Sequence, residues 1–170
     1  GVRERMIEAV GLRLRSDVPL AFCMSGGVDS VSLISIAKKI YDYDVHGFTI
    51  VNKDERYDER ELIKYTRNSL GLNHTEIPIN TDDFLERMQT LVTQHDAPVY
   101  TISYYAHWLL QQAIAEQGYK ISVSGTAADE LFSGYYDHHL LYLHAIQNEP
   151  ALLHASTNNW VEHVKPIVRN

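Results

Sequence analysis

The sequence predicts an α/β fold in which helices cover both faces of a parallel sheet, the doubly wound arrangement. Short apolar runs, each long enough for one strand, alternate along the chain with amphipathic segments of helical period. The first apolar run also ends in a glycine-rich turn that is followed at once by a helical pattern. Such a turn is typical of parallel sheets that bind a ligand beyond the carboxyl ends of their strands.

Two helices and two strands are expected in the N-terminal part of the chain. Apolar residues recur at helical spacing in the first segment, until Pro19 breaks the pattern, and again over residues 31–41. Residues 20–24 and 44–51 are mainly apolar and are expected to form strands. The apolar helix positions are Val2, Met6, Ala9, Val10 and Leu14 in the first segment and Leu33, Ile36, Ala37 and Ile40 in the second.

The same alternation continues in the middle of the chain. A helix is expected from Tyr57 to a stop at Gly71, with acidic residues at its positively charged start. Residues 73–79 are expected to form an edge strand, because Pro78 has no N–H to donate to a neighbouring strand.

Two more helices precede the last expected strand. Residues 80–83 cap the first helix, residues 103–117 form the second, and residues 120–124 form the fourth strand. If the second and fourth strands both flank the first, the strand order is 3-2-1-4. The inner face of the first of these helices is expected to hold Phe84, Leu85, Met88, Leu91 and Val92.

The turn after the first strand, Ser25-Gly26-Gly27-Val28-Asp29-Ser30, has the features of a phosphate-binding loop. Unpaired N–H groups at a helix start attract an anion, two glycines let the backbone approach it, and the serines add hydroxyl donors. No lysine follows the glycines as in the G-x-x-x-x-G-K-[ST] loop, and Asp29 would repel a polyphosphate unless a cation lay between them. The loop therefore predicts a nucleotide bound with Mg²⁺. The alternative is an ordinary βα turn in which Asp29 only favours the helix dipole.

A second turn of the same kind follows the fourth strand. Residues 124–129 also begin with Ser-Gly and end with an acid in the first turn of the next helix. The expected strand order places this turn beside the first one, so Asp29 and Asp129 could share one Mg²⁺ on a nucleotide.

Three motifs together resemble a known family. The S-G-G-V-D-S loop resembles the S-G-G-x-D-S loop of the ATP pyrophosphatases, which cleave ATP between the α- and β-phosphates. Together with residues 13–19 (RLRSDVP) and 124–135 (SGTAADELFSGY), it resembles the synthetase domain of asparagine synthetase. The resemblance implies a Rossmann-like, adenine nucleotide alpha hydrolase-like fold. It also implies a ligase that uses ATP and Mg²⁺ to activate a carboxylate, aspartate or similar, as an acyl-adenylate, which ammonia then attacks.

The resemblance also implies roles for individual residues. Asp29 and Asp129 would hold the metal, and these two with Thr126 would be the catalytic residues. Backbone near Cys23 and Thr49 would contact the adenine, and Gly125 would approach the adenosine. The ATP-binding set is then Cys23, Ser25, Gly26, Gly27, Asp29, Ser30, Thr49, Ser124 and Gly125.

One position departs from the family motif. Asparagine-forming members place a glutamate, suited to take a proton from ammonia, where this chain has Thr126 in the motif S-G-E-G-x-D-E. A threonine hydroxyl cannot accept that proton near neutral pH. The base then lies elsewhere, or the substrate is not aspartate, or the domain no longer completes amide formation. A related amidotransferase or β-lactam-type synthetase, a non-catalytic ATP-binding paralogue and a purely structural domain are the other hypotheses.

Length, composition and charge limit the number of domains and the classes of protein that the chain can belong to. A chain of 170 residues with 45% hydrophobic residues is expected to form one globular domain, with a helical segment of uncertain packing over residues 140–170. By resemblance it is expected to be truncated at its C-terminus and to take ammonia from solution or from a separate glutaminase domain or subunit. A net charge of −7 argues against nucleic-acid binding, and the lack of a long apolar run argues against a membrane span and for the cytoplasm.

Overall fold

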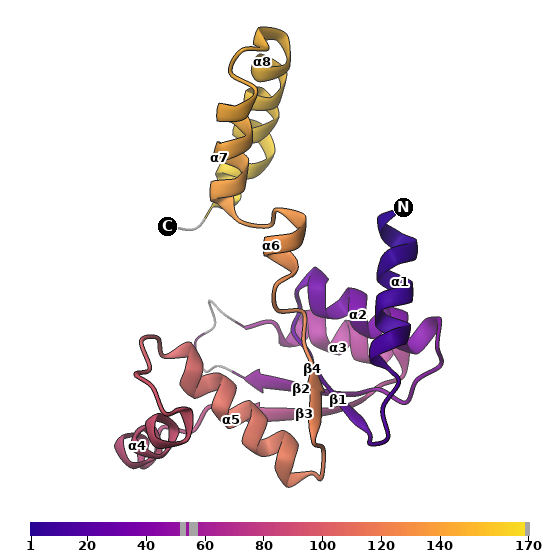
Figure 1. Cartoon of the computed structure of the whole chain (residues 1–170), viewed down its shortest axis with the longest axis vertical. Coiled ribbons are helices and arrows are strands. Elements are labelled where there is room, and N and C mark those ends of the chain that lie inside the picture. Colours follow the sequence, from indigo (N-terminus) through magenta and orange to yellow (C-terminus); the bar gives the residue numbers. More distant parts are fainter. Residues whose placement is uncertain (52–53, 55–57, 169–170) are drawn as a thin grey trace. The chain divides into compact units, whose positions relative to one another are not determined.

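The computed structural model describes residues 1–51, 54 and 58–168. The chain divides into two compact units, Gly1–Gly125 and Thr126–Asn170, which are called here the sheet unit and the helical unit (Figure 1). Each unit is described by itself.

The sheet unit contains four parallel strands in the order β3-β2-β1-β4, which confirms the predicted fold class and strand order. Pro78 ends β3, at one edge of the sheet, as predicted. The central strands β1 and β2 hold the most deeply buried residues, among them Phe22 and Phe48. The strands are β1 (Leu20–Cys23), β2 (His46–Val51), β3 (Asn73–Pro78) and β4 (Ile121–Val123).

The described residues of the sheet unit also form five helices. They are α1 (Val2–Arg13), α2 (Val28–Lys39), α3 (Arg60–Leu70), α4 (Phe84–His95) and α5 (Ser103–Glu116). Successive residues of a strand point to opposite faces, so β1 contributes to two cores. Leu20 and Phe22 pack with residues of α1, α2 and α3, while Ala21 packs with Leu110 and Ile114 of α5. Helices therefore cover both faces of the sheet, as in a doubly wound fold.

The predicted apolar faces of three helices are partly wrong. The buried face of α2 is Ser30, Ile34 and Ala37, and Ile40 lies beyond the end of the helix and is 47% exposed. In α4 only Leu91 is buried, where it packs with Tyr105 and Leu109 of α5, whereas Leu85 is 81% exposed. In α1 only Val10 of the predicted residues is buried, and in α4 Val92 is also exposed. Leu14, Leu33 and Ile36 are only partly buried but do pack against the core, as predicted.

The helix boundaries follow local signals closely where those signals are strong. Gly71 adopts a left-handed backbone with φ of 62° and ends α3, as predicted. The predicted start of that helix at Tyr57 lies outside the described residues, and α3 begins at Arg60.

The helical unit consists of α6 (Ala128–Phe132), α7 (Tyr136–Ala145) and α8 (Pro150–Asn159). A π-helical turn (Trp160–Val164) and a 3₁₀ turn (Lys165–Ile167) extend α8. Among the described residues of this unit, Ile146, just after α7, is the one buried hydrophobic residue. Across the described ranges of both units, every helix is too short or too polar to cross a bilayer.

Candidate functional site

The turn between β1 and α2 is organised by its two serines. The Oγ of Ser30 is buried and accepts a hydrogen bond from the Ser25 N–H at 3.1 Å. The same hydroxyl lies 3.2 Å from the carbonyl oxygen of Ser25 and 3.2 Å from that of Gly27, to either of which it can donate. The Gly27 N–H donates to the Ser25 Oγ at 3.2 Å. These bonds fix the turn at the carboxyl end of β1.

The two glycines of the turn have different surroundings. A Cβ on Gly26 would lie 3.0 Å from the Leu62 Cβ and 3.2 Å from the Glu59 Cβ, so Gly26 packs directly on the start of α3. Gly27 is exposed, and a Cβ there would meet only the Ser25 Oγ, at 3.3 Å. Its φ of −74° and ψ of 150° are open to any residue. The Gly27 side of the turn is therefore open.

The turn after β4 lies against the turn after β1. A Cβ on Gly125 would be 2.8 Å from the backbone nitrogen of Ser30 and 2.9 Å from the Asp29 Cβ. Such closeness is possible only because Gly125 has no side chain. Up to Gly125, the structure therefore confirms the prediction that the two Ser-Gly turns are neighbours. Ser124, which precedes Gly125, is exposed.

Asp29 and Asp129 each lie in the first turn of a helix that follows a Ser-Gly turn. Asp29 is half-buried in the first turn of α2, and Asp129 is half-buried in the first turn of α6. Gly134 donates its N–H to the Asp129 carbonyl at 3.0 Å, and its missing side chain leaves the space that the Asp129 carboxylate occupies.

Carboxylates of this kind fit Mg²⁺, which commonly takes one or two protein carboxylates and completes its shell with water and phosphate oxygens. Among the residues that the structure describes, His, Cys, Asp and Glu form no cluster of three that could hold a metal by themselves. A divalent ion on either aspartate would therefore depend on the oxygens of a bound nucleotide.

A buried hydrogen-bond chain supports the end of β1. The Thr49 hydroxyl donates to the Met24 carbonyl at 2.6 Å, and the Nε2 of His74 lies 2.9 Å from the Thr49 Oγ1. Because the hydroxyl proton is committed to Met24, His74 must donate through Nε2. Burial, as the main cause, lowers the pKa of His74 below its usual range.

Cys23 lies on the other face of β1, toward α5. Its side chain is half-buried, and the Sγ lies 4.0 Å from the Nε2 of Gln111. Burial raises the pKa of the Cys23 thiol, so the side chain stays neutral near pH 7.

Two acids before α3 have different partners. Glu59 Oε2 accepts a hydrogen bond from the Gly26 N–H at 2.8 Å, which ties α3 to the glycine turn. Asp58 instead pairs with Arg60, whose Nε and Nη2 donate to the carboxylate at 2.8 and 2.6 Å. The Arg60 hydrogen bonds hold the pKa of Asp58 at about 2. The sequence predicts both acids at a helix start, and no pattern in it distinguishes the one that reaches the turn.

Thr126 and Ala127 begin the helical unit. Thr126 is exposed, and Ala127 has a φ of 76°, a left-handed backbone that glycine adopts more easily. The family motif S-G-E-G-x-D-E has a glycine at this second position. Nearby, the Tyr135 hydroxyl donates to Glu130 Oε1 at 2.7 Å and lowers the pKa of that carboxyl.

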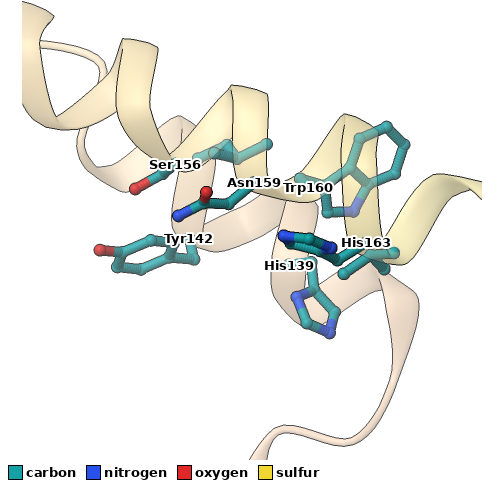
Figure 2. Close-up of a pocket in the computed structure, with 8 residues that line it drawn as sticks. His139, Tyr142, Ser156, Asn159, Trp160 and His163 are labelled. Atoms are coloured by element: carbon teal, nitrogen blue, oxygen red, sulfur yellow. The ribbon is translucent and has the colours of Figure 1, made fainter.

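A cavity of about 400 Å³ lies within the helical unit (Figure 2). Tyr142 and His139 of α7 face residues of α8 and of the π-helical turn across it, and its walls are mainly apolar. The Nε1 of Trp160 is buried there without a hydrogen-bond partner among the described residues. The residues predicted to bind ATP or metal lie elsewhere in the chain. The lining residues are His139, Tyr142, Leu143, Ser156, Asn159, Trp160, His163 and Val164.

Comparison with solved structures supports the fold. The NH3-dependent NAD synthetase of Campylobacter jejuni matches with a TM-score of 0.51 over 78% of this chain and 58% of that chain, at 16% identity. This likeness and the strand order identify a Rossmann-like, adenine nucleotide alpha hydrolase-like fold.

Sequence comparison identifies the family. Amidase chyE of Penicillium rubens is 28% identical over 79% of this chain and 22% of its own length. Asparagine synthetase [glutamine-hydrolyzing] 1 of Bacillus subtilis is 27% identical over 79% of this chain and 21% of its own length. The chain thus spans only about a fifth of the length of these relatives. The family model described as asparagine synthase matches residues 1–166, nearly the whole sequence, and the chain therefore belongs to the asparagine synthase family.

Proposed function

We propose that this chain is the ATP-binding part of an AMP-forming amide ligase, which activates a carboxylate as an acyl-adenylate. The observation that carries the proposal is the pair of Ser-Gly turns, in contact through Gly125 at the carboxyl ends of two adjacent parallel strands. In a doubly wound sheet a ligand binds at this position, where the strand order reverses. Membership of the asparagine synthase family supports ATP as that ligand.

The turn after β1 would hold the phosphates. Gly27 is the N-cap of α2, a helix of 12 residues, so a phosphate on its open side would meet N–H groups and the positive end of a helix dipole. The backbone near Cys23 and Thr49 would contact the adenine. The hydrogen bond from the Thr49 hydroxyl to the Met24 carbonyl holds these two stretches of backbone together. Gly125 and Ser124 would lie along the adenosine.

Asp29 and Asp129 would hold Mg²⁺ on the phosphates. When bound, the ion would offset the negative charge that grows on the departing pyrophosphate. The N–H groups at the start of α2 would stabilise the same charge, and they need no rearrangement because the serine hydrogen bonds already fix the turn.

In the reaction, a carboxylate oxygen would attack the α-phosphorus, and pyrophosphate would leave. Ammonia, from solution or from a separate glutaminase domain or subunit, would then attack the acyl carbon and release AMP. Thr126 is exposed but carries no group that accepts a proton near pH 7. Three interpretations follow: the proton acceptor lies elsewhere, or the substrate is a carboxylate other than aspartate, as in a related amidotransferase or β-lactam-type synthetase, or the domain no longer completes amide formation.

The test is the metal dependence of ATP binding, measured by calorimetry. Asp29→Asn should weaken the binding of Mg²⁺-ATP at least tenfold, about 1.4 kcal/mol, and change the binding of metal-free ATP much less. Asp44→Asn, which makes the same charge change at an exposed position just before β2, is the matched control and should bind as the wild type does. Equal losses for Asp29→Asn with and without metal would contradict the metal role.

A further inference from the structure

We propose that Glu59 is a positioning residue for the nucleotide site. Its carboxylate accepts the Gly26 N–H and so holds this end of the glycine turn against the start of α3. In our proposal, this contact keeps the backbone N–H groups that follow Gly26 in position to bind a phosphate. This inference rests on the function proposed above and adds a residue that lies 33 positions away from the turn.

The contact is direct and specific. Glu59 Oε2 lies 2.8 Å from the Gly26 nitrogen, and a bond from a backbone N–H to a carboxylate is stronger than one to a neutral acceptor. The Glu59 side chain does not cap its own helix. At the start of α3, Asp58 accepts the Arg60 N–H at 3.0 Å instead, which leaves the Glu59 carboxylate for Gly26.

The helix that follows Glu59 is anchored in the core. Ile63, one turn further along α3, is 3% exposed and packs in the core formed with α1, α2 and β1. Leu62 backs Gly26, since a Cβ on that glycine would lie 3.0 Å from it. Gly125 closes the turn from a second side, against Ser30 and Asp29. An anion can therefore approach the turn only from the Gly27 side. Glu59 fixes the position of Gly26, which lies next to that side.

The negative charge of Glu59 has the opposite effect on ATP affinity from its positioning of the turn. A carboxylate close to the place of a triphosphate repels it, so geometry and charge have opposite effects on affinity. The two effects can be separated, because glutamine keeps an acceptor oxygen and loses the charge, whereas alanine loses both.

The experiment compares the wild type, Glu59→Gln and Glu59→Ala in Mg²⁺-ATP binding by calorimetry. Glu59→Ala should bind Mg²⁺-ATP at least tenfold more weakly, and Glu59→Gln should bind it as tightly as the wild type or up to a few fold more tightly. Glu61→Ala, an exposed acid in the first turn of the same helix, is the matched control and should have no effect. The melting temperature of each variant is measured alongside, and Glu59→Gln keeps the comparison informative if Glu59→Ala does not fold.

A second measurement does not need ATP. Hydrogen exchange of the Gly26 amide in the ligand-free protein should be faster in Glu59→Ala than in the wild type, and intermediate in Glu59→Gln. If wild-type protein binds no Mg²⁺-ATP, the proposed function fails, and unchanged Gly26 exchange would separately overturn the role of Glu59. If ATP binds equally to all variants, Glu59 has no positioning role. Tighter binding by Glu59→Ala than by the wild type would mean that the carboxylate competes with phosphate, which also overturns the proposal.

Discussion

Gly26 and Gly27 are adjacent, but different forces require a glycine at each position. Gly26 lacks space for a Cβ because Leu62 and Glu59 of the α3 region lie against it. Gly27 has an ordinary extended backbone and free space on its outer side, where the proposed phosphate would bind. The first glycine is thus a packing requirement of the fold, whereas our proposal makes the second a requirement of the ligand.

This difference predicts opposite outcomes for two alanine variants. Gly27→Ala should cost at most about 1 kcal/mol, or roughly 2–4 °C in a protein of this size, yet weaken ATP binding because the methyl group projects into the phosphate site. Gly26→Ala should lower the melting temperature more, because its Cβ would press on Leu62. Thermal unfolding and calorimetry with Mg²⁺-ATP measure the two effects. An ATP affinity unchanged in Gly27→Ala would rule out phosphate binding at this turn.

At the scale of the elements, strands β2 and β3 carry two histidines, His46 and His74, whose protonation affects the stability of the fold. The ring of His46 lies between two hydroxyls, with Nδ1 3.0 Å from that of Tyr119 and Nε2 2.8 Å from that of Thr75. It also stacks on Phe48, with the ring centroids 4.3 Å apart. Burial is the main cause that lowers the pKa of His46, as it is for His74 on β3.

These lowered pKa values predict a loss of stability in mild acid. In the unfolded chain both imidazoles titrate near 6.5, so below that pH the unfolded state binds more protons than the folded state. The stability that the neutral rings contribute is present above 6.5 and is lost as the pH falls toward the lowered folded-state values. The melting temperature should therefore fall between about pH 7.5 and about pH 5.5.

The control for this prediction is a comparison of single variants. His74→Gln keeps a donor toward Thr49 and should flatten the pH dependence of the melting temperature over this range. His107→Gln, at an exposed position of α5, should leave the slope unchanged. Equal slopes in all three proteins would show that His74 does not contribute to the loss.

The strands and their order can be predicted from sequence, whereas the buried faces of the helices can be predicted only in part. Short apolar runs and the stop at Gly71 are local signals, and the proline of β3 correctly marks an edge. Leu85 is predicted to share a face with Leu91, but six residues of an α-helix turn it about 120° away, and it is exposed. Local sequence patterns therefore predict where an element lies in the chain better than they predict which of its residues are buried.

The same limit applies within the site. The serine, glycine and aspartate pattern of the turn after β1 is enough to single out Ser25, Gly26, Gly27 and Asp29, because these residues are adjacent in sequence. The bond from Gly26 to Glu59 joins residues 33 positions apart and depends on how α3 packs on the core. By sequence the neighbouring acid, Asp58, is an equal candidate for this bond, and only its pairing with Arg60 separates the two.

At the scale of the whole molecule, our proposal assigns one Mg²⁺-ATP to two aspartates that belong to different units of the chain. The sheet unit provides Asp29 with the glycine turn, and the helical unit provides Asp129, whose carboxylate fills the space left by Gly134. If one Mg²⁺-ATP binds to both aspartates, the two units are linked through the ligand. Binding of Mg²⁺-ATP should then protect amides of both units from hydrogen exchange.

A double-mutant cycle tests whether the two aspartates hold one metal. Asp29→Asn and Asp129→Asn should each weaken Mg²⁺-ATP binding at least tenfold, while the double variant should be little weaker than the weaker single variant. Non-additive effects of this kind are expected for residues that share a partner, because the first loss already removes most of the metal's contribution. Metal-free ATP provides the baseline for all four proteins, and their melting temperatures exclude unfolding as the cause. Losses that multiply in the double variant would instead mean that Asp29 and Asp129 act at separate places, and the shared Mg²⁺ would have to be abandoned even if ATP still binds to the glycine turn.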